Sequence, residues 1–501
     1  MLLPTTPPTD WLAERAARSP LRAALYWQQR VWTYGDLHRD ANHLAARLRA
    51  AGVDNGARVA MLLPNTPEAV LLIHAVVRVG ATLVPLNTRL TPAELAWQVA
   101  QTTPAVLVHN NRTAAQAEPL GVHVPLLNVD EPAAPPRNVR PFSPLPFDGV
   151  HAIVFTSGTT GRPKGAMLTL ANHFWSATAS GWRLGVQRND CWLLCMPLYH
   201  VGGMAIVLRS ALYGTAILLH ERFDTDAVTH ALDSGRVTLV SVVPTMLKRL
   251  LDARRDRPLP PSVRTVLVGG AATPPPLLER ALAAGLPVAL TYGLTEAASQ
   301  VATAAPDEVR AAPGTVGAPL WGTEVRILRD DGTPAAVGEV GEITVRGRTV
   351  MRGYWQNPVA TQRTLRQGWL HTGDMGYLDE VGRLWMMQRR TDLIVSGGEN
   401  VYPSEVEGVL LRHPAVAAVC VVGVPDAEWG EAVTAVIQLH PEASATPEEI
   451  RAFCRDHLAG YKCPKHVLFV DALPLTASGK IARQAVKERL AGGAWRENRM
   501  G

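Results

Sequence analysis

Cysteine is scarce in this sequence of 501 residues. There are five cysteines, an odd number, and no two of them form a C-x-x-C pair. Their scatter along the chain excludes a disulfide framework and a zinc ribbon. We therefore expect all five to be reduced thiols in the core.

A run of apolar residues long enough to cross a membrane is also missing. The most apolar long stretch, residues 191–219, is interrupted by His200, by Gly202 with Gly203, and by Arg209. Because of this charge and this glycine pair, residues 191–219 are a poor membrane span, and we expect them to lie in the buried core of the protein. The N-terminus has neither a basic segment nor a continuous apolar one, so a secretory signal is not expected. The expected compartment is the cytoplasm.

Charge of one sign is not concentrated anywhere. The 49 basic and 44 acidic residues leave a formal charge of +5, and no Lys/Arg run is long enough for a nucleic-acid stripe. A small anionic ligand therefore fits better than a polymer, and we expect neither a nucleic-acid partner nor a membrane span.

Apolar residues make up 47% and charged residues 19% of the chain, as in a globular protein. Residues 58–85 predict a strand, a helix and a second strand, with Thr66 as N-cap, Pro67 in the first turn and Gly80 as the stop. Further buried strands are predicted at residues 105–108, 216–219, 238–243, 265–268 and 288–290. This alternation of strands and helices favours an α/β fold with parallel sheets.

Composition along the chain suggests two domains. A proline-rich linker at residues 130–148 separates two halves of the first, and short strands with glycine turns from about residue 316 predict a small β unit. We predict a large N-terminal domain, residues 1–388, with two parallel-rich sheets flanked by helices plus this β unit. A small α+β domain follows at residues 389–501, where Thr446 and Glu449 form a capping box.

The strongest local motif is VFTSGTTGRPKG at residues 154–165, a strand followed by glycines, hydroxyls and one lysine. Glycines let backbone N–H groups converge on an anion, Ser and Thr add donors, and Lys adds a point charge. The motif is not a Walker A loop, because Lys164 is followed by Gly165. A solvated turn would not need so many of these residue types in succession. The predicted phosphate-binding residues are Thr156, Ser157, Gly158, Thr159, Thr160, Gly161 and Lys164.

Other clusters follow predicted strands, where open parallel sheets place ligand-binding loops. Thr295 and Glu296 could serve phosphate and Mg²⁺, although an ordinary turn capped by Thr295 explains the same residues. The small residues around Gly270 and Ala271 would let a flat base approach the backbone. Asp374 suits two ribose hydroxyls.

Two basic residues carry weaker signals. Arg389 could complete the grip on a ribose. Lys480 follows a glycine turn near the C-terminus, and by position alone most such lysines are solvated surface groups.

Taken in order, these motifs resemble the adenylate-forming superfamily of acyl-CoA synthetases, adenylation domains and luciferases, and the resemblance runs over most of the chain. Residues 172–177, 190–193, 241–247 and 292–300 are similar to the o-succinylbenzoate:CoA ligases of menaquinone biosynthesis. The resemblance implies an AMP-forming acid:thiol ligase that uses ATP, Mg²⁺ and coenzyme A. The acid first becomes an acyl-adenylate with release of pyrophosphate, and the CoA thiol then displaces AMP.

The resemblance also implies a role for each matching residue. Lys480 would stabilise the first transition state, in which two anions must approach each other. The loop from Thr156 to Lys164 would hold the β- and γ-phosphates, and Glu296 the metal. For the nucleotide it implies Gly270, Ala271, Tyr292, Gly293, Thr295, Asp374 and Arg389.

In this superfamily the small C-terminal domain is mobile and turns between the two half-reactions. The hinge position falls on Thr391, where many members have Asp or Lys, and Gly397 with Gly398 would approach the site for thioester formation. His200 would stand between the acyl pocket and the thiol tunnel, although a core histidine explains it as well.

A second carboxylate on the acid would need a cation or several donors, because an unpaired buried carboxylate is costly. Arg209, Ser299 and Gln300 are our candidates for this role. A structural ion pair is the alternative for Arg209.

Other functions stay open. The chain could be another aryl- or medium-chain acyl-CoA ligase, a stand-alone adenylation enzyme that loads a carrier protein, or a catalytically silent nucleotide-binding regulator. The sequence also leaves a homo-oligomer open.

Overall fold

The computed structural model of the protein describes residues 8–132, 142–156, 163–271, 273, 275–329, 331–387, 394–474, 481, 483–493 and 495. The chain divides into two compact units. The larger contains residues 1–88, 96–155 and 165–387, and the smaller contains residues 89–95, 156–164 and 388–501. The predicted boundary at 388/389 stays a prediction, because residues 388–393 lie outside the described part.

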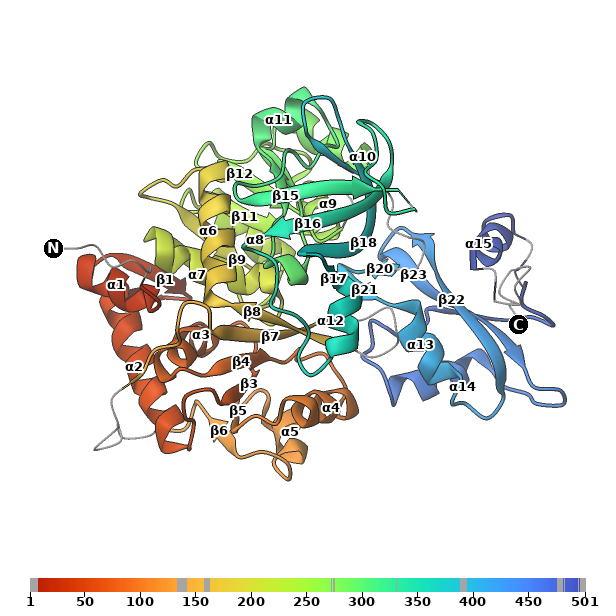
Figure 1. Ribbon diagram of the computed structural model, residues 1–501, viewed down its shortest axis with the longest axis horizontal. Helices are drawn as coiled ribbons and strands as arrows, with labels where there is room; N and C mark the ends of the chain where they lie inside the picture. The colour runs from red at the N-terminus through yellow and green to blue at the C-terminus, as the bar shows by residue number, and fades with distance from the viewer. Residues whose placement is uncertain are drawn as a thin grey trace. The chain divides into compact units, whose positions relative to one another are not determined.

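The first sheet has eight strands in the order β14-β13-β12-β11-β9-β10-β1-β2 (Figure 1). Its inner neighbours are parallel, and β2 and β14 are antiparallel edges. The strands are β1 (Ala23–Trp27), β2 (Arg30–Thr33), β9 (Cys191–Leu194), β10 (Ala216–Leu219), β11 (Leu239–Val242), β12 (Thr265–Val268), β13 (Val288–Tyr292) and β14 (Ala302–Ala304).

The second sheet has the order β6-β5-β3-β4-β7-β8, with parallel pairing from β6 to β7. Its strands are β3 (Arg58–Leu62), β4 (Thr82–Pro85), β5 (Val106–His109), β6 (Leu126–Asn128), β7 (Val150–Thr156) and β8 (Lys164–Thr169). The helices of this part of the chain are α1 (Trp11–Arg18), α2 (Tyr34–Ala50), α3 (Pro67–Val79), α4 (Pro92–Thr102), α5 (Ala114–Ala117), η1 (Glu118–Leu120), α6 (Leu170–Leu184), α7 (Val201–Tyr213), α8 (Thr225–Asp233), α9 (Pro244–Arg254), α10 (Pro275–Ala283), η2 (Thr295–Ala297), α11 (Pro306–Ala311) and α12 (Pro358–Thr364).

An antiparallel β unit completes the larger unit, in the order β15-β16-β18-β17 with β19 beside β18. Its strands are β15 (Thr323–Leu328), β16 (Gly341–Gly347), β17 (Leu365–Arg366), β18 (Trp369–Leu378) and β19 (Leu384–Met386).

The smaller unit is α+β. Its sheet runs β21-β20-β23-β22, with β24 parallel to β23. The elements are β20 (Ile394–Ser396), β21 (Glu399–Val401), α13 (Pro403–Leu410), β22 (Val416–Asp426), β23 (Gly430–Leu439), α14 (Pro447–Arg455), β24 (His466–Phe469) and α15 (Arg483–Ala491). The capping box predicted at Thr446 and Glu449 opens α14. The predicted fold class is thus confirmed, and the mobility of this domain stays a prediction.

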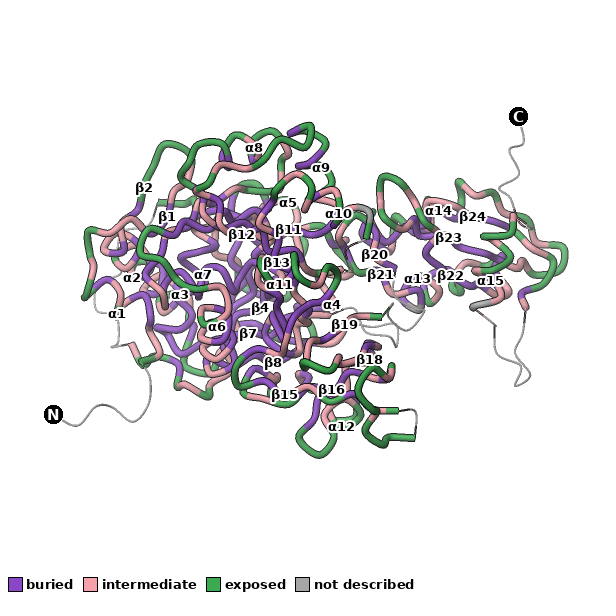
Figure 2. Tube along the Cα trace, turned by 90° about the horizontal axis from the view of Figure 1, so that it is seen from above, coloured by how far each residue is buried: buried purple, intermediate pink, exposed green. Residues whose placement is uncertain are grey.

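Helices α3 and α7 are the innermost layer of the larger unit. They contact each other, and each also contacts strands of its own sheet, β3 and β4 for α3 and β9 and β10 for α7. Every residue of α3 except Glu68 is buried. A helix that is apolar all round belongs in an interior. Figure 2 shows buried residues concentrated in this part of the chain and exposed ones at its periphery.

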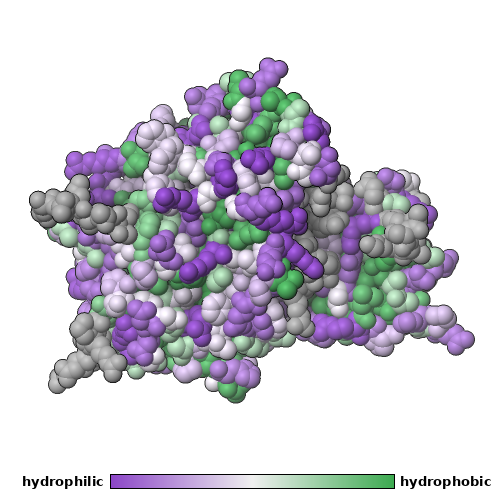
Figure 3. All heavy atoms as spheres, in the orientation of Figure 1, coloured by the Kyte–Doolittle hydropathy of each residue, from purple (hydrophilic) through white to green (hydrophobic). Residues whose placement is uncertain are grey.

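Thr66, Pro67 and Gly80 bound α3 as predicted, although the Thr66 side chain makes no capping bond. Gly80 adopts a left-handed φ of 70°, a conformation that glycine tolerates best. All five cysteines are buried. Among the residues that the structure describes, no helix has the length and apolar character to cross a bilayer. On the face drawn in Figure 3, hydrophobic residues are interspersed with hydrophilic ones.

Three of the buried histidines of the larger unit, His74, His151 and His173, have strongly lowered pKa values. The rings of His151 and His173 meet edge to face, with centroids 5.1 Å apart, and His151 Nε2 donates to the Ile73 carbonyl at 3.2 Å. Burial lowers the pKa of His74 to about 3 and that of His151 to about 4, and it holds the pKa of His173 well below its ordinary value. The folded state therefore keeps all three rings neutral near pH 7.

This predicts that stability falls with acidification. An unfolded histidine takes up a proton near pH 6.5, whereas buried His151 does so only near pH 4, so the free energy of unfolding decreases as the pH drops through this window. At about 1.4 kcal/mol per pKa unit, His151 alone contributes a loss of roughly 3 kcal/mol. Urea unfolding between pH 7 and pH 4 should show a flatter pH dependence in His151→Asn than in the wild type. The exposed His230→Asn serves as control, and an unchanged slope in His151→Asn would contradict this account.

Candidate active site

Several predicted site residues lie at one edge of the eight-stranded sheet. Strands β9, β11, β12 and β13 are parallel neighbours, so the loops after their carboxyl ends meet at the same edge. These loops or strand ends carry His200, Gly270, Ala271, Tyr292, Gly293, Thr295 and Glu296. Gly270 has a left-handed φ of 80°, a conformation that accounts for glycine at this position.

Tyr292 and Asp374 are brought together from two different sheets. Tyr292 ends β13, Asp374 lies in β18, and the Tyr292 hydroxyl donates to Asp374 Oδ2 at 2.8 Å. Both residues are buried, with Asp374 only 3% exposed. Two residues predicted to bind the same nucleoside are thus neighbours in the fold.

The turn before Asp374 is held by residues that are not among the predicted site residues. Glu342 accepts the N–H of Gly373 through Oε1 at 3.0 Å, and its Oε2 contacts His371 Nδ1 at 3.0 Å. Thr372 accepts the N–H of Asp374 and donates to the backbone of β16. The register of β16 on β18 shifts between Glu342 and Thr344, and this irregularity brings Glu342 level with the turn. No local pattern near Glu342 signals it.

Glu296, predicted to hold a metal, has a tyrosine as its neighbour. The hydroxyl of Tyr354 donates to Glu296 Oε1 at 2.8 Å, and the N–H of Met351 donates to the Glu296 carbonyl at 2.8 Å. The sequence analysis had not singled out Tyr354. The segment after β16 thus fixes both the backbone and the side chain of Glu296.

A strained turn follows Glu296. Ala298 and Ser299 have φ values of 53° and 100°, which residues other than glycine seldom adopt. The Ser176 hydroxyl, from α6, donates to the Ala298 carbonyl at 2.7 Å. A Cβ on Gly293 would lie 1.6 Å from the Ser299 carbonyl oxygen. The close approach explains why glycine is required at position 293, and backbone strain of this kind clusters at ligand sites.

Gln300, a candidate for the acyl pocket, is buried beside this turn. Its Nε2 donates to Thr303 Oγ1 at 3.0 Å, and Thr303 in turn contacts the hydroxyl of Thr291. Its Oε1 has no hydrogen-bond partner among the residues that the structure describes. The buried Gln300 Oε1 could therefore accept a hydrogen bond from a bound ligand.

Arg209 lies in α7, is 2% exposed, and its guanidinium lies 5.7 Å from the Trp192 ring. Within the described ranges its Nε and Nη2 make no hydrogen bond and no carboxylate pairs with it, so the structural ion pair considered from sequence is not found there. Burial lowers the pKa of Arg209. His200 is the N-cap residue of α7, and its ring contacts that of Tyr199 at 4.7 Å.

The phosphate loop is described only at its two ends. Thr156 ends β7, Lys164 begins β8, and the Thr156 hydroxyl donates to the Lys164 carbonyl at 3.4 Å. The rest of the loop, Ser157, Gly158, Thr159, Thr160 and Gly161, lies outside the described residues. So do Arg389, Thr391 and Lys480.

Gly397 and Gly398 form the turn between β20 and β21 of the smaller unit. Both have left-handed φ values, 59° and 81°, which accounts for glycine at each position. The N–H of Gly397 donates to the Trp429 carbonyl at 2.8 Å.

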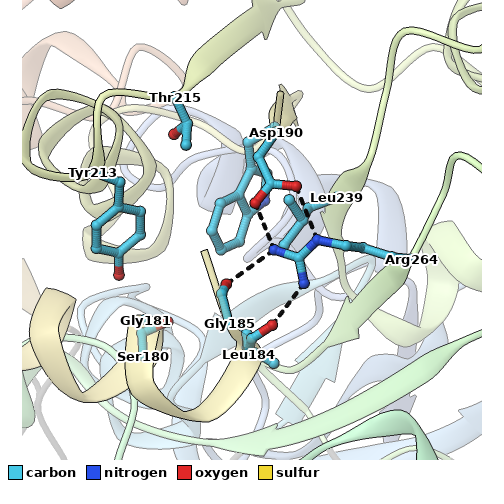
Figure 4. Close-up of a pocket in the computed structure, with 10 residues that line it drawn as sticks. Ser180, Gly181, Leu184, Gly185, Asp190, Tyr213, Thr215, Leu239 and Arg264 are labelled. Carbon is cyan, nitrogen blue, oxygen red and sulfur yellow. Dashed lines mark hydrogen bonds and ion pairs between the residues drawn. The ribbon is translucent and has the colours of Figure 1, made fainter. Parts of the chain in front are cut away.

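A small cavity elsewhere in the larger unit is not this site. It measures about 10 Å³, and Asp190 and Arg264 line it (Figure 4). Arg264 donates to both Asp190 oxygens and to the carbonyls of Leu184 and Gly185. Arg264 thus links the end of α6 to Asp190, the residue before β9. None of the predicted site residues lines this cavity.

Comparison with known proteins gives the family. Residues 12–355 match the model of the AMP-binding enzyme family, and residues 405–480 match that of the AMP-binding enzyme C-terminal domain. The chain belongs to the AMP-binding enzyme family. The segments that match contain the sheet edge with Tyr292 and Glu296, as well as part of the α+β unit.

Full-length relatives of this family are similar to the chain. The 2-succinylbenzoate–CoA ligase of Geobacillus sp. (strain WCH70) is 41% identical over 480 residues, covering 96% of this chain and 97% of that one. A solved structure of o-succinylbenzoate CoA synthetase from Bacillus subtilis, a double mutant bound to a product analogue, has a TM-score of 0.91 at 38% identity, covering 96% and 98% of the two chains. Another structure of the Bacillus subtilis enzyme, with ATP and magnesium ion, has a TM-score of 0.73 at 37% identity, covering 95% and 99%.

The tight turn at Gly293 gives a direct test of the site. In Gly293→Ala the added Cβ would overlap the Ser299 carbonyl, so the turn after Glu296 must move. We expect a stability loss of about 3 kcal/mol or more, as for other steric conflicts in a packed interior, together with loss of ATP-dependent pyrophosphate release. Thermal unfolding and a pyrophosphate assay would measure both.

Gly408→Ala is the matched control. Gly408 lies in α13 with no atom within 4 Å of the new Cβ, so alanine should be neutral or stabilising there. Wild-type activity in Gly293→Ala would show that the turn tolerates movement.

Proposed function

We propose that the protein is an ATP-dependent o-succinylbenzoate:CoA ligase, an AMP-forming acid–thiol ligase of menaquinone biosynthesis. It would convert the acid to an acyl-adenylate with release of pyrophosphate, and then to the CoA thioester. The family and the names of its full-length relatives support the reaction class. The single observation that carries the choice of acid is that the buried guanidinium of Arg209 has no carboxylate partner among the described residues.

A buried guanidinium without a carboxylate partner is costly, because it has lost its hydration and gained no compensating charge. Arg209 is in this situation among the described residues. A substrate with a second carboxylate that does not react would supply the missing charge and accept the unused N–H groups. o-Succinylbenzoate carries such a carboxylate, whereas a simple fatty acid does not. Gln300 and Ser299 would line the same pocket.

The remaining roles follow the order of the chemistry. Lys164 and the loop from Thr156 to Gly161 would hold the β- and γ-phosphates, with Thr295 at the α-phosphate. Tyr292, Gly270 and Ala271 would hold the adenine, and Asp374 and Arg389 the ribose. Gly293 would belong to the same nucleotide site. Lys480 would bring positive charge to the α-phosphate and the reacting carboxylate, where charge is redistributed in the transition state.

Mg²⁺ would be held by Glu296 together with phosphate oxygens. Mg²⁺ is usually bound by one or two carboxylates plus substrate phosphates, and Glu296 would supply such a carboxylate. When bound, the ion would neutralise charge on the phosphates.

For the second half-reaction, His200 would stand between the acyl pocket and the path of the thiol. Thr391 would be the hinge position of the mobile C-terminal domain, and Gly397 with Gly398 would take part in thioester formation. The odd number and the scatter of the cysteines support a reducing compartment, and we propose the cytoplasm.

The test is pyrophosphate release with ATP, Mg²⁺ and CoA across o-succinylbenzoate, benzoate, a hydroxycinnamate and octanoate, compared as kcat/KM. We expect a preference of orders of magnitude for o-succinylbenzoate. Turnover of another acid instead would favour a different acyl-CoA ligase. Adenylation without transfer to CoA would favour a carrier-loading enzyme, and no turnover of any acid would favour a nucleotide-binding regulator.

Arg209→Met should raise the KM for o-succinylbenzoate about 100-fold or more, because removing one partner of a buried charge pair costs several kcal/mol. The KM for ATP should change little, and benzoate, which lacks the second carboxylate, should be used no worse than by the wild type. Steady-state kinetics with both acids would measure this. An equal loss for ATP and for both acids would instead assign Arg209 a structural role.

A further inference from the structure

We propose that Tyr354 is a positioning residue that orients the carboxylate of Glu296 toward the metal, an inference that rests on the proposed metal role of Glu296. The Tyr354 hydroxyl donates to Glu296 Oε1 at 2.8 Å. Tyr354 is 7% exposed and Glu296 is partly buried, so this hydrogen bond is partly shielded from competing water. A shielded bond of this kind holds a side chain in one orientation more firmly than a solvated one.

The backbone on both sides of this contact is also held. The N–H of Met351 donates to the Glu296 carbonyl, and the N–H of Tyr354 donates to the hydroxyl of Thr361 in α12. Neither end of the Tyr354–Glu296 contact can therefore shift independently of its neighbours. These backbone contacts therefore fix the position of the Tyr354 hydroxyl.

The same segment pairs with the strand that follows the phosphate loop. All of these contacts are backbone hydrogen bonds. The N–H of Arg352 donates to the Met167 carbonyl, the N–H of Met167 to the Gly353 carbonyl, and the N–H of Trp355 to the Gly165 carbonyl. Ala166 and Tyr354 form an isolated antiparallel bridge. Tyr354 thus belongs to one short segment that contacts both Glu296 and strand β8.

The hydroxyl can hold Glu296 without blocking a metal. An ionised carboxylate has about four acceptor positions on its two oxygens, so a hydrogen bond at one of them leaves room for a cation. A neighbour that donates to a metal-binding carboxylate fixes its rotation and typically changes metal affinity 10- to 100-fold when removed. The aromatic ring has no part in this role, so phenylalanine is the informative replacement.

Tyr354→Phe should therefore raise the Mg²⁺ concentration needed for half-maximal pyrophosphate release about tenfold, with kcat at saturating Mg²⁺ close to the wild-type value. Binding of Mn²⁺ in the presence of a non-hydrolysable ATP analogue, measured by electron paramagnetic resonance without any acid, should weaken by a similar factor. Thermal unfolding would confirm that the variant is folded.

Tyr377→Phe is the matched control. Tyr377 lies in β18 with its ring stacked on Trp385 at 6.1 Å, and within the described ranges its hydroxyl makes no hydrogen bond. Both metal readouts should equal those of the wild type. A general effect of losing a tyrosine hydroxyl would appear in this variant as well.

Glu296→Gln and the double variant complete the test. If Tyr354 acts through Glu296, Tyr354→Phe adds no further loss of Mn²⁺ affinity in the Glu296→Gln background. Full additivity of the two losses, or unchanged metal affinity in Tyr354→Phe while Glu296→Gln weakens it, would overturn the positioning role. Unchanged metal affinity in Glu296→Gln would remove the metal role of Glu296 itself, and with it the basis of this inference.

Discussion

The hydrogen bond from Tyr292 to Asp374 joins the two sheets that carry the residues proposed to bind the nucleotide. One partner ends a strand of the parallel sheet, and the other lies in an antiparallel strand of the β unit. Because both are buried, the bond cannot be exchanged for water at low cost. It therefore sets the distance between the loops of the sheet edge and the turn from His371 to Asp374. Glu342 also fixes this turn, through its contacts with His371 and with the N–H of Gly373.

A second constraint comes from the layer between the two large sheets. Helices α3 and α7 are buried on almost every face, so each polar group in them must be satisfied locally or left for a ligand. Arg78 in α3 is satisfied, since it pairs with Asp10 at 2.7 Å and donates to Asn42. Arg209 in α7 is not satisfied among the described residues. This contrast between two buried arginines in adjacent helices is the basis for the substrate role proposed for Arg209.

Local sequence signals were sufficient for much of the fold. The positions of β3 and α3 follow from short apolar runs together with Thr66 and Gly80. The predicted phosphate loop is a contiguous motif, but its binding role stays a prediction. The supporting contacts of Glu342 and Tyr354 could not be predicted in this way. Each depends on strand register or on pairing between segments that are distant in the chain. Ser176 is a similar case, because its bond to Ala298 requires knowing how α6 packs.

The burial of every cysteine has a practical consequence for a protein proposed to handle a thiol substrate. Burial raises the pKa of Cys191, Cys195 and Cys454 to about 12, so these side chains stay protonated and are poor nucleophiles. The folded chain should therefore contribute almost no background to a colorimetric titration of sulfhydryl groups. Disappearance of free coenzyme A could be followed continuously in the presence of the protein, with the reagent reporting the small molecule alone.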